Sequence, residues 1–203
     1  MELRDALSQI AALRATAAAA ERFRGYRALP VGLTGGLAGV AALLQPHVAP
    51  DPAADLPGYL GLWLGTATLG VGVAGWGVWQ RLRSAVDPVG RDLTRLAVGQ
   101  FAPCLAAGLL LTVAVASHSP DAGRLLPGVW QVLFSLGVFA SWRLLPPAVL
   151  WVGVFYLVCG TVNVARPGGG LGPWGMGLPF GAGQLATAAI LYWQLERTHV
   201  EPD

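Results

Sequence analysis

Residues 125–141 read LLPGVWQVLFSLGVFAS, and after WRLLPP the chain continues with AVLWVGVFYLVCGTVNV through residue 164. Both long runs are almost purely apolar, and a helix that crosses a bilayer needs about 20 such residues. Every backbone amide in lipid must also be hydrogen bonded within its own segment, which favours helices. We therefore expect a helical hairpin in a membrane. Its tip would hold Arg143, with Pro146 and Pro147 in the first turn of the second helix.

The rest of the chain has the same apolar character. Of its 203 residues, 54% are hydrophobic and only 12% are charged, about half the charged fraction of a soluble domain. The charges form short islands that separate apolar runs. The sequence therefore predicts an all-α membrane protein with six transmembrane helices and no separate soluble domain. The expected spans are residues 28–45, 58–80, 96–117, 125–141, 146–165 and 174–194.

Two segments lie outside these spans at the ends of the chain. In residues 1–27 apolar side chains recur at three- and four-residue steps, which predicts an amphipathic cytoplasmic helix. It would lie along the lipid headgroups or pack on the bundle. In the first case Arg22, Arg24 and Arg27 would lie near lipid phosphates. Because five arginines are mixed with three acids there, no dense basic patch for nucleic acid is present. Residues 195–203 form a polar tail.

The arginines predict the orientation in the membrane. All thirteen basic residues are arginine. If the N-terminus is inside, eleven of them fall in inner segments and only Arg124 and Arg166 fall outside. Positive residues concentrate on the cytoplasmic side of membrane proteins. We expect a multi-pass protein of the bacterial inner (plasma) membrane with both termini in the cytoplasm and residues 81–95 as a charged inner loop.

Small residues predict how the spans would pack. The first span has two GxxxG spacings, Gly32/Gly36 and Gly35/Gly39, and the second carries a stripe of Gly61, Gly65, Thr68, Gly72 and Gly75. Small residues let transmembrane helices approach closely. We therefore expect these faces to pack against neighbouring helices.

No Asp, Glu, Lys, Arg or His lies inside any of the six predicted spans. Ionisable groups at depth mark proton relays and ion paths, and a buried haem needs axial ligands, usually including a histidine. Hydrolysis inside the membrane would need a catalytic constellation, and none is present there. The sequence therefore predicts a protein that is not an enzyme, with no catalytic residue and no cofactor.

Four uncharged polar residues in the spans are candidate ligand-binding residues: Gln100, Gln131, Asn163 and Gln184. Amides in hydrocarbon must find hydrogen-bond partners, so these side chains should face the interior of the bundle. They would either bond neighbouring helices or line a path for an uncharged or zwitterionic ligand. Pro103 and Pro179 lie close by, and each frees a backbone carbonyl that a ligand or a neighbouring helix could use.

Two weaker candidates lie at the ends of the spans. His47 and His118 are both expected at the outer surface, near acidic residues, and two imidazoles with a carboxylate could hold a metal ion. The alternative is that these histidines are simply solvated, as loop histidines more often are. Arg143 is expected to reach lipid headgroups from the inner tip of the hairpin.

The segments LPGVWQVLFSLGVFASWRLLP (126–146) and WGMGLPFGAGQL (174–185) resemble a family of small bacterial six-helix integral membrane proteins. The resemblance covers most of the chain. Genes of that family often lie beside a gene for a winged-helix regulator, which implies a regulated membrane module. The resemblance implies no catalytic or binding residue.

Two functions are compatible with these observations. The first is a non-enzymatic membrane interaction or regulatory module, acting through helix packing and an arginine-rich cytoplasmic surface. Its partners would be lipids, a second copy or another protein, and not nucleic acid. The alternative is a transporter or channel for a small uncharged or lipid-like solute. A continuous polar cavity lined by Gln100, Gln131 and Gln184 would favour transport, and a dry, packed bundle would favour the module.

Overall fold

The computed structural model describes residues 28–84, 88–166 and 170–197, and this part of the chain is helical without a strand. Each predicted span overlaps one of its six α-helices, which are α2 (Ala28–Val48), α3 (Leu56–Ser84), α4 (Pro88–His118), α5 (Leu126–Ser141), α6 (Val149–Ala165) and α7 (Pro173–Leu191). Short 3-10 turns flank α5, and a π-turn, Tyr192–Glu196, follows α7. The predicted amphipathic helix at residues 1–27 lies outside the described residues.

Four stretches are long and apolar enough to cross a membrane: Ala28–Val48, Leu56–Gln80, Arg95–His118 and Pro120–Leu144. The remaining two helices are shorter, with 17 residues in α6 and 19 in α7. The prediction of an all-α membrane protein is therefore confirmed at the level of four candidate spans. Six spans remain a prediction.

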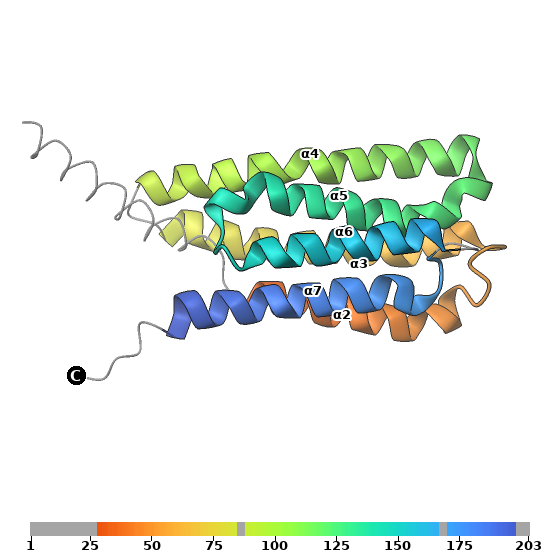
Figure 1. Cartoon of the computed structure of the whole chain (residues 1–203), viewed down its shortest axis with the longest axis horizontal. Helices are drawn as coiled ribbons and strands as arrows, with labels where there is room; N and C mark the ends of the chain where they lie inside the picture. Colours follow the sequence, from red (N-terminus) through yellow and green to blue (C-terminus); the bar gives the residue numbers. More distant parts are fainter. Residues whose placement is uncertain (1–27, 85–87, 167–169, 198–203) are drawn as a thin grey trace, which may run out of the picture.

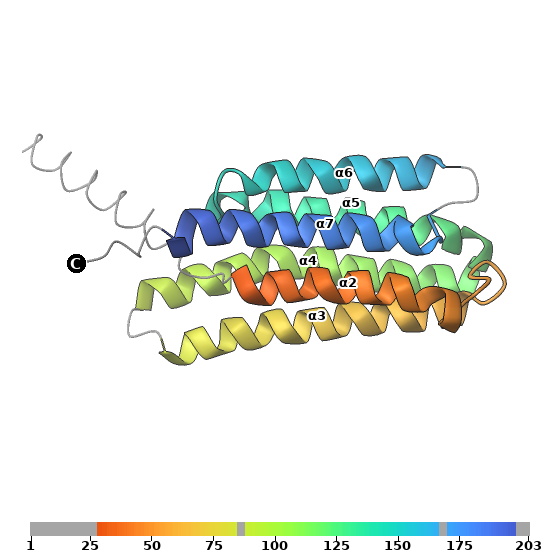
Figure 2. The same cartoon turned by 90° about the horizontal axis from the view of Figure 1, so that it is seen from below.

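The helices lie side by side along the long axis of the molecule (Figures 1 and 2). The most extensive contacts join α2 to α7 and α5 to α6, while α4 packs on α5 and α3 on α2. Although α3 and α4 are consecutive, they touch each other little. One end of the bundle holds the connections after α2, α4 and α6, and we call it the Asp51 end. The other, the Arg143 end, holds the α3–α4 and α5–α6 connections.

The predicted charged loop at residues 81–95 is mostly helix. α3 continues through Ser84 and α4 begins at Pro88, so only residues 85–87 lie outside the described helices. Proline suits this first helical position because the N–H it lacks would have no acceptor within the helix. Arginine and leucine are good helix formers in water as well as in lipid. A loss of hydrophobicity was therefore misread as the end of a helix.

The prolines at the hairpin tip lie before the second helix and not in its first turn. α6 begins at Val149, and the Val149 N–H donates to the Pro146 carbonyl at 2.9 Å. The Leu150 N–H similarly donates to the Pro147 carbonyl at 3.1 Å. Pro146 and Pro147 thus supply the acceptors of a tight turn that leads into α6.

Glycines bring two helix pairs close together. At the α5–α6 contact a Cβ on Gly128 would lie 2.6 Å from the Gly160 carbonyl oxygen, and one on Gly160 would lie 2.8 Å from the Gly128 oxygen. At the α2–α7 contact a Cβ on Gly35 would lie 3.0 Å from the Gly181 oxygen. Gly128 and Gly160 leave no room for a side chain and the contact at Gly35 is tight, so these glycines set the spacing of the helices.

The glycine stripe on α3 does not pack inside the bundle, contrary to the prediction. Gly61, Gly65, Gly72 and Gly75 are exposed, and a Cβ on any of them would have no neighbour within 4 Å. α3 rests on α2 through other residues, and α4 stands away from it. Glycine thus marks a buried contact in α5 and α6 and an open surface along the stripe of α3.

Aromatic side chains fill the middle of the bundle. The Phe134 ring of α5 lies 5.0 Å from Phe101 of α4, 4.8 Å from Tyr156 of α6 and 5.4 Å from Phe180 of α7, between ring centroids. Contacts of this kind, edge-on or tilted, stabilise a core beyond the area that they bury. Four helices therefore meet at one aromatic cluster.

Candidate functional site

Pro179 creates an unusual hydrogen-bond acceptor in α7. Because proline has no N–H, the carbonyl four residues earlier, that of Gly175, has no donor within the helix. Two amide side chains from other helices use it: Gln131 Nε2 of α5 donates to it at 2.7 Å, and Asn163 Nδ2 of α6 donates to it at 2.8 Å. Three helices are thus joined at one carbonyl oxygen.

Gln131 and Asn163 also bind each other. Asn163 Nδ2 lies 3.1 Å from Gln131 Oε1, and Gln131 Nε2 lies 3.7 Å from the sulfur of Met176. Both residues are buried, Gln131 completely. The structure therefore brings together two of the four predicted polar residues and satisfies their amides with protein atoms.

A third buried amide, Gln45 of α2, was not among the predicted site residues. Its Nε2 donates to the Leu171 carbonyl at 2.7 Å, and its Oε1 accepts from the indole N–H of Trp63 at 2.9 Å. Gln45 is the last residue of the predicted first span, where an amide would be solvated. In fact α2 continues through Pro46 to Val48, so Gln45 stays inside the bundle.

The other two predicted residues lie elsewhere. Gln184 is half-buried on α7, nine residues after Gly175 and hence about 14 Å further along the helix. Gln100 lies in the first half of α4, towards the Arg143 end, and its side-chain oxygen is buried without a hydrogen-bond partner among the described residues. The four candidates therefore do not line one site.

In the part of the chain that the structure describes, two tyrosine hydroxyls are also buried without a hydrogen-bond partner. Tyr59 of α3 has no exposed surface, and Tyr156 of α6 is almost equally buried. Tyr156 lies against Gly183 of α7, where a built Cβ would be 2.5 Å from its hydroxyl oxygen. Such groups are rare in folded proteins and each calls for an explanation.

The predicted metal site has no geometric support. Among the described residues no three His, Cys, Asp or Glu side chains come together as metal ligands. His118 is exposed, and its Nδ1 lies 3.3 Å from the Ala114 carbonyl of its own helix. The nearby carboxylates cap local structure instead, since Asp51 accepts from the Ala53 and Ala54 N–H groups and Asp55 from that of Gly58.

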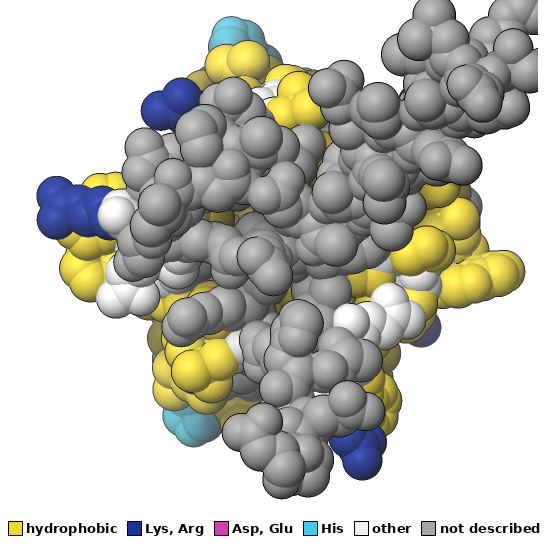
Figure 3. Space-filling view, turned by 90° about the vertical axis from the view of Figure 1, so that its left-hand side faces the viewer, with side chains coloured by type: hydrophobic (Ala, Val, Ile, Leu, Met, Phe, Trp, Pro, Cys, Tyr) yellow, Lys and Arg dark blue, Asp and Glu magenta, His cyan; other side chains and the backbone are white. Residues whose placement is uncertain are grey.

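Arginines and tryptophans meet at the Arg143 end. The Arg83 guanidinium lies 3.9 Å from the centre of the Trp79 ring, and that of Arg143 lies 5.8 Å from the Trp142 ring. Figure 3, which looks onto this end, shows arginine side chains at the edge of the molecule between areas of hydrophobic surface. Arg22, Arg24 and Arg27, the other predicted lipid contacts, lie outside the described residues.

These features define the class of protein: an all-helical bundle with four helices fit to cross a membrane, joined by buried amides near one end. No protein-family model matches the chain, and no curated protein or solved structure has significant similarity to it. The family resemblance noted in the sequence therefore remains an expectation. The function has to be argued from the chain's own residues.

Proposed function

We propose that the chain is a six-span protein of the inner membrane, with both termini in the cytoplasm, and acts as a non-enzymatic interaction or regulatory module. Its partners would be membrane lipids and a second membrane protein or copy of itself. Nucleic acid and cofactors have no part in this proposal.

The observation that carries the proposal is the use of the buried amides. Gln131, Asn163 and Gln45 all donate to backbone carbonyls of the protein itself. Beyond Gln131 towards the Arg143 end, aromatic rings occupy the middle of the bundle. Polar side chains that line a solute path would instead present free hydrogen-bonding groups along it. This arrangement supports a structural use of the amides.

The exposed surface of α3 supports an interaction role. Glycine in a helix interior lowers helix stability by about 1 kcal/mol relative to alanine. A helix rich in glycine is therefore expected to gain something else from these residues. In α3 the gain is not packing within the chain, because Gly61, Gly65 and Gly72 have no neighbour within 4 Å. Close approach of another transmembrane helix would use such a surface.

The test is solute flux in reconstituted vesicles. We expect proteoliposomes that contain the protein to swell in glycerol, urea or glycine no faster than empty vesicles, measured by stopped-flow light scattering. A protein-dependent rate that rises with protein density would overturn the module proposal.

The orphan oxygen of Gln100 is the observation that favours the alternative, a transporter or channel for an uncharged solute. A buried side-chain oxygen without a partner is expensive unless another state or a ligand uses it. If this alternative holds, the protein-dependent swelling should be abolished by Gln100→Leu and kept by Gln184→Leu, whose side chain is half-buried elsewhere.

A further inference from the structure

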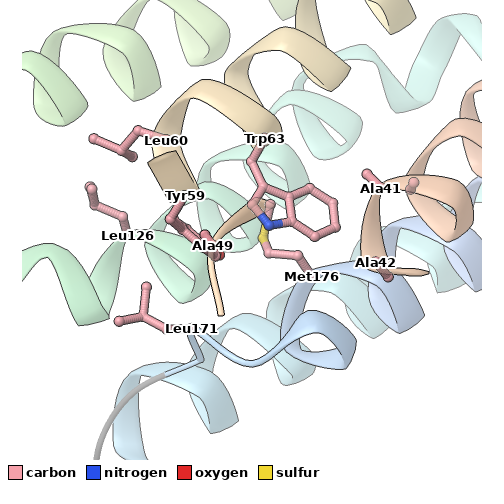
Figure 4. Close-up of a cluster of buried hydrophobic side chains, with 10 residues drawn as sticks. Ala41, Ala42, Ala49, Tyr59, Leu60, Trp63, Leu126, Leu171 and Met176 are labelled. Atoms are coloured by element: carbon pink, nitrogen blue, oxygen red, sulfur yellow. The ribbon is translucent and has the colours of Figure 1, made fainter. Parts of the chain in front are cut away.

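Gly170–Gly172 lead into α7, which begins at Pro173, and the Leu171 and Gly175 carbonyls accept hydrogen bonds from the buried amides at the Asp51 end. We call Gly170–Met176, these three residues and the first turn of α7, the strap. The Leu171 side chain points inward and is only 8% exposed. Figure 4 shows it on the same side of the buried hydrophobic cluster as Leu126 and Tyr59. The strap therefore closes this end of the core.

The strap is held mainly through its backbone. The Leu171 carbonyl accepts from Gln45 of α2, and the Gly175 carbonyl accepts from Gln131 of α5 and Asn163 of α6. The Gly170 N–H donates to the Arg124 carbonyl at 3.3 Å. Three amide side chains, each from a different helix, thus donate hydrogen bonds to carbonyls of the strap.

The composition of the strap is suited to movement. Three of its seven residues are glycine, at positions 170, 172 and 175, and glycine adopts new backbone angles without steric cost. Its deeply buried side chains are those of Leu171 and Met176. Besides the amide bonds, the burial of these two side chains is the main packing that keeps the strap in place.

An unpaired hydroxyl lies in the cluster that the strap covers. Tyr59 is fully buried and has no hydrogen-bond partner in this closed arrangement. Its ring belongs to the same cluster as Leu171. If the strap lifts, water or a ligand can reach this hydroxyl, so the closed state carries a cost that the open state does not.

We propose that the strap is a lid, latched by Gln45, Gln131 and Asn163, and that its opening uncovers a neutral polar surface at the Asp51 end. The groups uncovered are the three amides and the Tyr59 hydroxyl, none of which carries a charge. This inference goes beyond the proposed function and does not depend on it, because a module and a transporter could both use such a lid.

Cysteine labelling in nanodiscs tests the lid. In a background with Cys104→Ala and Cys159→Ala, a soluble maleimide is added to Leu171→Cys and, separately, to Gly172→Cys. Gly172 is exposed with open space around it, so we expect rapid labelling there. Leu171→Cys should react at least tenfold more slowly, because its position is buried.

The latch is then removed. Adding Gln45→Leu or Gln131→Leu should raise the labelling rate of Leu171→Cys about tenfold, as expected for the loss of about one buried hydrogen bond from the closed state. The matched control is Thr112→Val, which removes the 2.8 Å hydrogen bond from Trp130 between α4 and α5 without touching the strap. It should change the rate less than twofold.

Two further measurements keep the test decisive. If Gln45→Leu fails to fold, Trp63→Phe removes only the N–H that orients Gln45 and should also speed labelling. Hydrogen exchange of the strap amides in the unsubstituted protein should be faster than in the middle of α7. Equal labelling at positions 171 and 172, or equal acceleration by Thr112→Val, would overturn the lid.

Discussion

At the scale of single residues, the buried Tyr156 hydroxyl affects the stability of the bundle. It is buried against α7 with no hydrogen-bond partner. Burying an unpaired polar group costs about 1–3 kcal/mol. The Tyr156 ring, by contrast, packs against Phe134 and Phe180.

We therefore expect Tyr156→Phe to raise the free energy of unfolding by about 1 kcal/mol, because it removes the hydroxyl and keeps the ring. Denaturant titration in a mild detergent would measure the change. Tyr192→Phe is the control, since that side chain is exposed and should have no effect. A loss of stability in Tyr156→Phe would mean that the hydroxyl has a partner in the folded protein.

The Gly175 carbonyl yields a second prediction at this scale. The pair Gln131→Leu and Asn163→Leu removes both of its donors and should cost about 1–3 kcal/mol. Pro179→Ala restores a backbone N–H that can reach the same carbonyl. In that background the pair should cost about 1 kcal/mol less.

A double-mutant cycle on the free energy of unfolding would measure this coupling. Pro103→Ala in α4 is the control background, because Pro103 is not the proline that frees the Gly175 carbonyl. If the two amide substitutions lowered the free energy of unfolding equally in the unsubstituted protein, in Pro179→Ala and in Pro103→Ala, the role assigned to Pro179 would be contradicted.

At the scale of the helix, glycines within apolar runs differ in what lies opposite them. A leucine at Gly160 would collide with the Gly128 carbonyl and with Val132, whereas a leucine at Gly65 would point into open space. Sequence spacing does not distinguish the two, because it gives the face of a helix but not what lies opposite.

We therefore expect Gly160→Leu to lower the free energy of unfolding by about 3 kcal/mol, or to prevent folding, because overpacking separates α5 from α6. Gly65→Leu and Gly72→Leu should leave the monomer as stable or slightly more stable, since leucine favours helix over glycine. Thermal melts in detergent would compare the three. A large loss in Gly65→Leu would show that α3 packs against another part of the chain.

The positions of the helices could be predicted from the sequence, but which helices pack against each other could not. Apolar runs and prolines located six helical segments, but the polar residues 81–95 were misread as a loop. The amides at positions 131 and 163 were expected to bond other helices or line a path, and Pro179 was expected to free a carbonyl. That these groups meet, and that Gln45 binds the strap, depends on α7 packing between α2 and α6, which no local pattern encodes.

For the whole molecule, the main asymmetry is one of charge. The exposed arginines Arg83, Arg95, Arg143 and Arg197 belong to the Arg143 end, while the other end carries Asp51, Asp55 and Asp121 with Arg124 and Arg166. Positive charge is retained on the cytoplasmic side during insertion. The Arg143 end should therefore face the cytoplasm.

Cysteine accessibility in intact cells and in inverted vesicles would test this orientation. With the native cysteines replaced, we expect Ser84→Cys to react with an impermeant maleimide only in inverted vesicles. Ala53→Cys, at an exposed position of the Asp51 end, should react only in intact cells. Labelling of Ser84→Cys from outside the cell would reverse the assignment.

The unequal lengths of the helices have a consequence for the surrounding lipid. At 1.5 Å per residue, the 17 residues of α6 extend about 26 Å, whereas α3 and α4, with 29 and 31 residues, extend about 44 and 47 Å. A typical hydrocarbon core is about 30 Å thick. If all three cross the bilayer, acyl chains beside α6 must compress while α3 and α4 project beyond the core. Such hydrophobic mismatch distorts the bilayer locally, so lipids with short acyl chains should gather along the α6 side of the molecule.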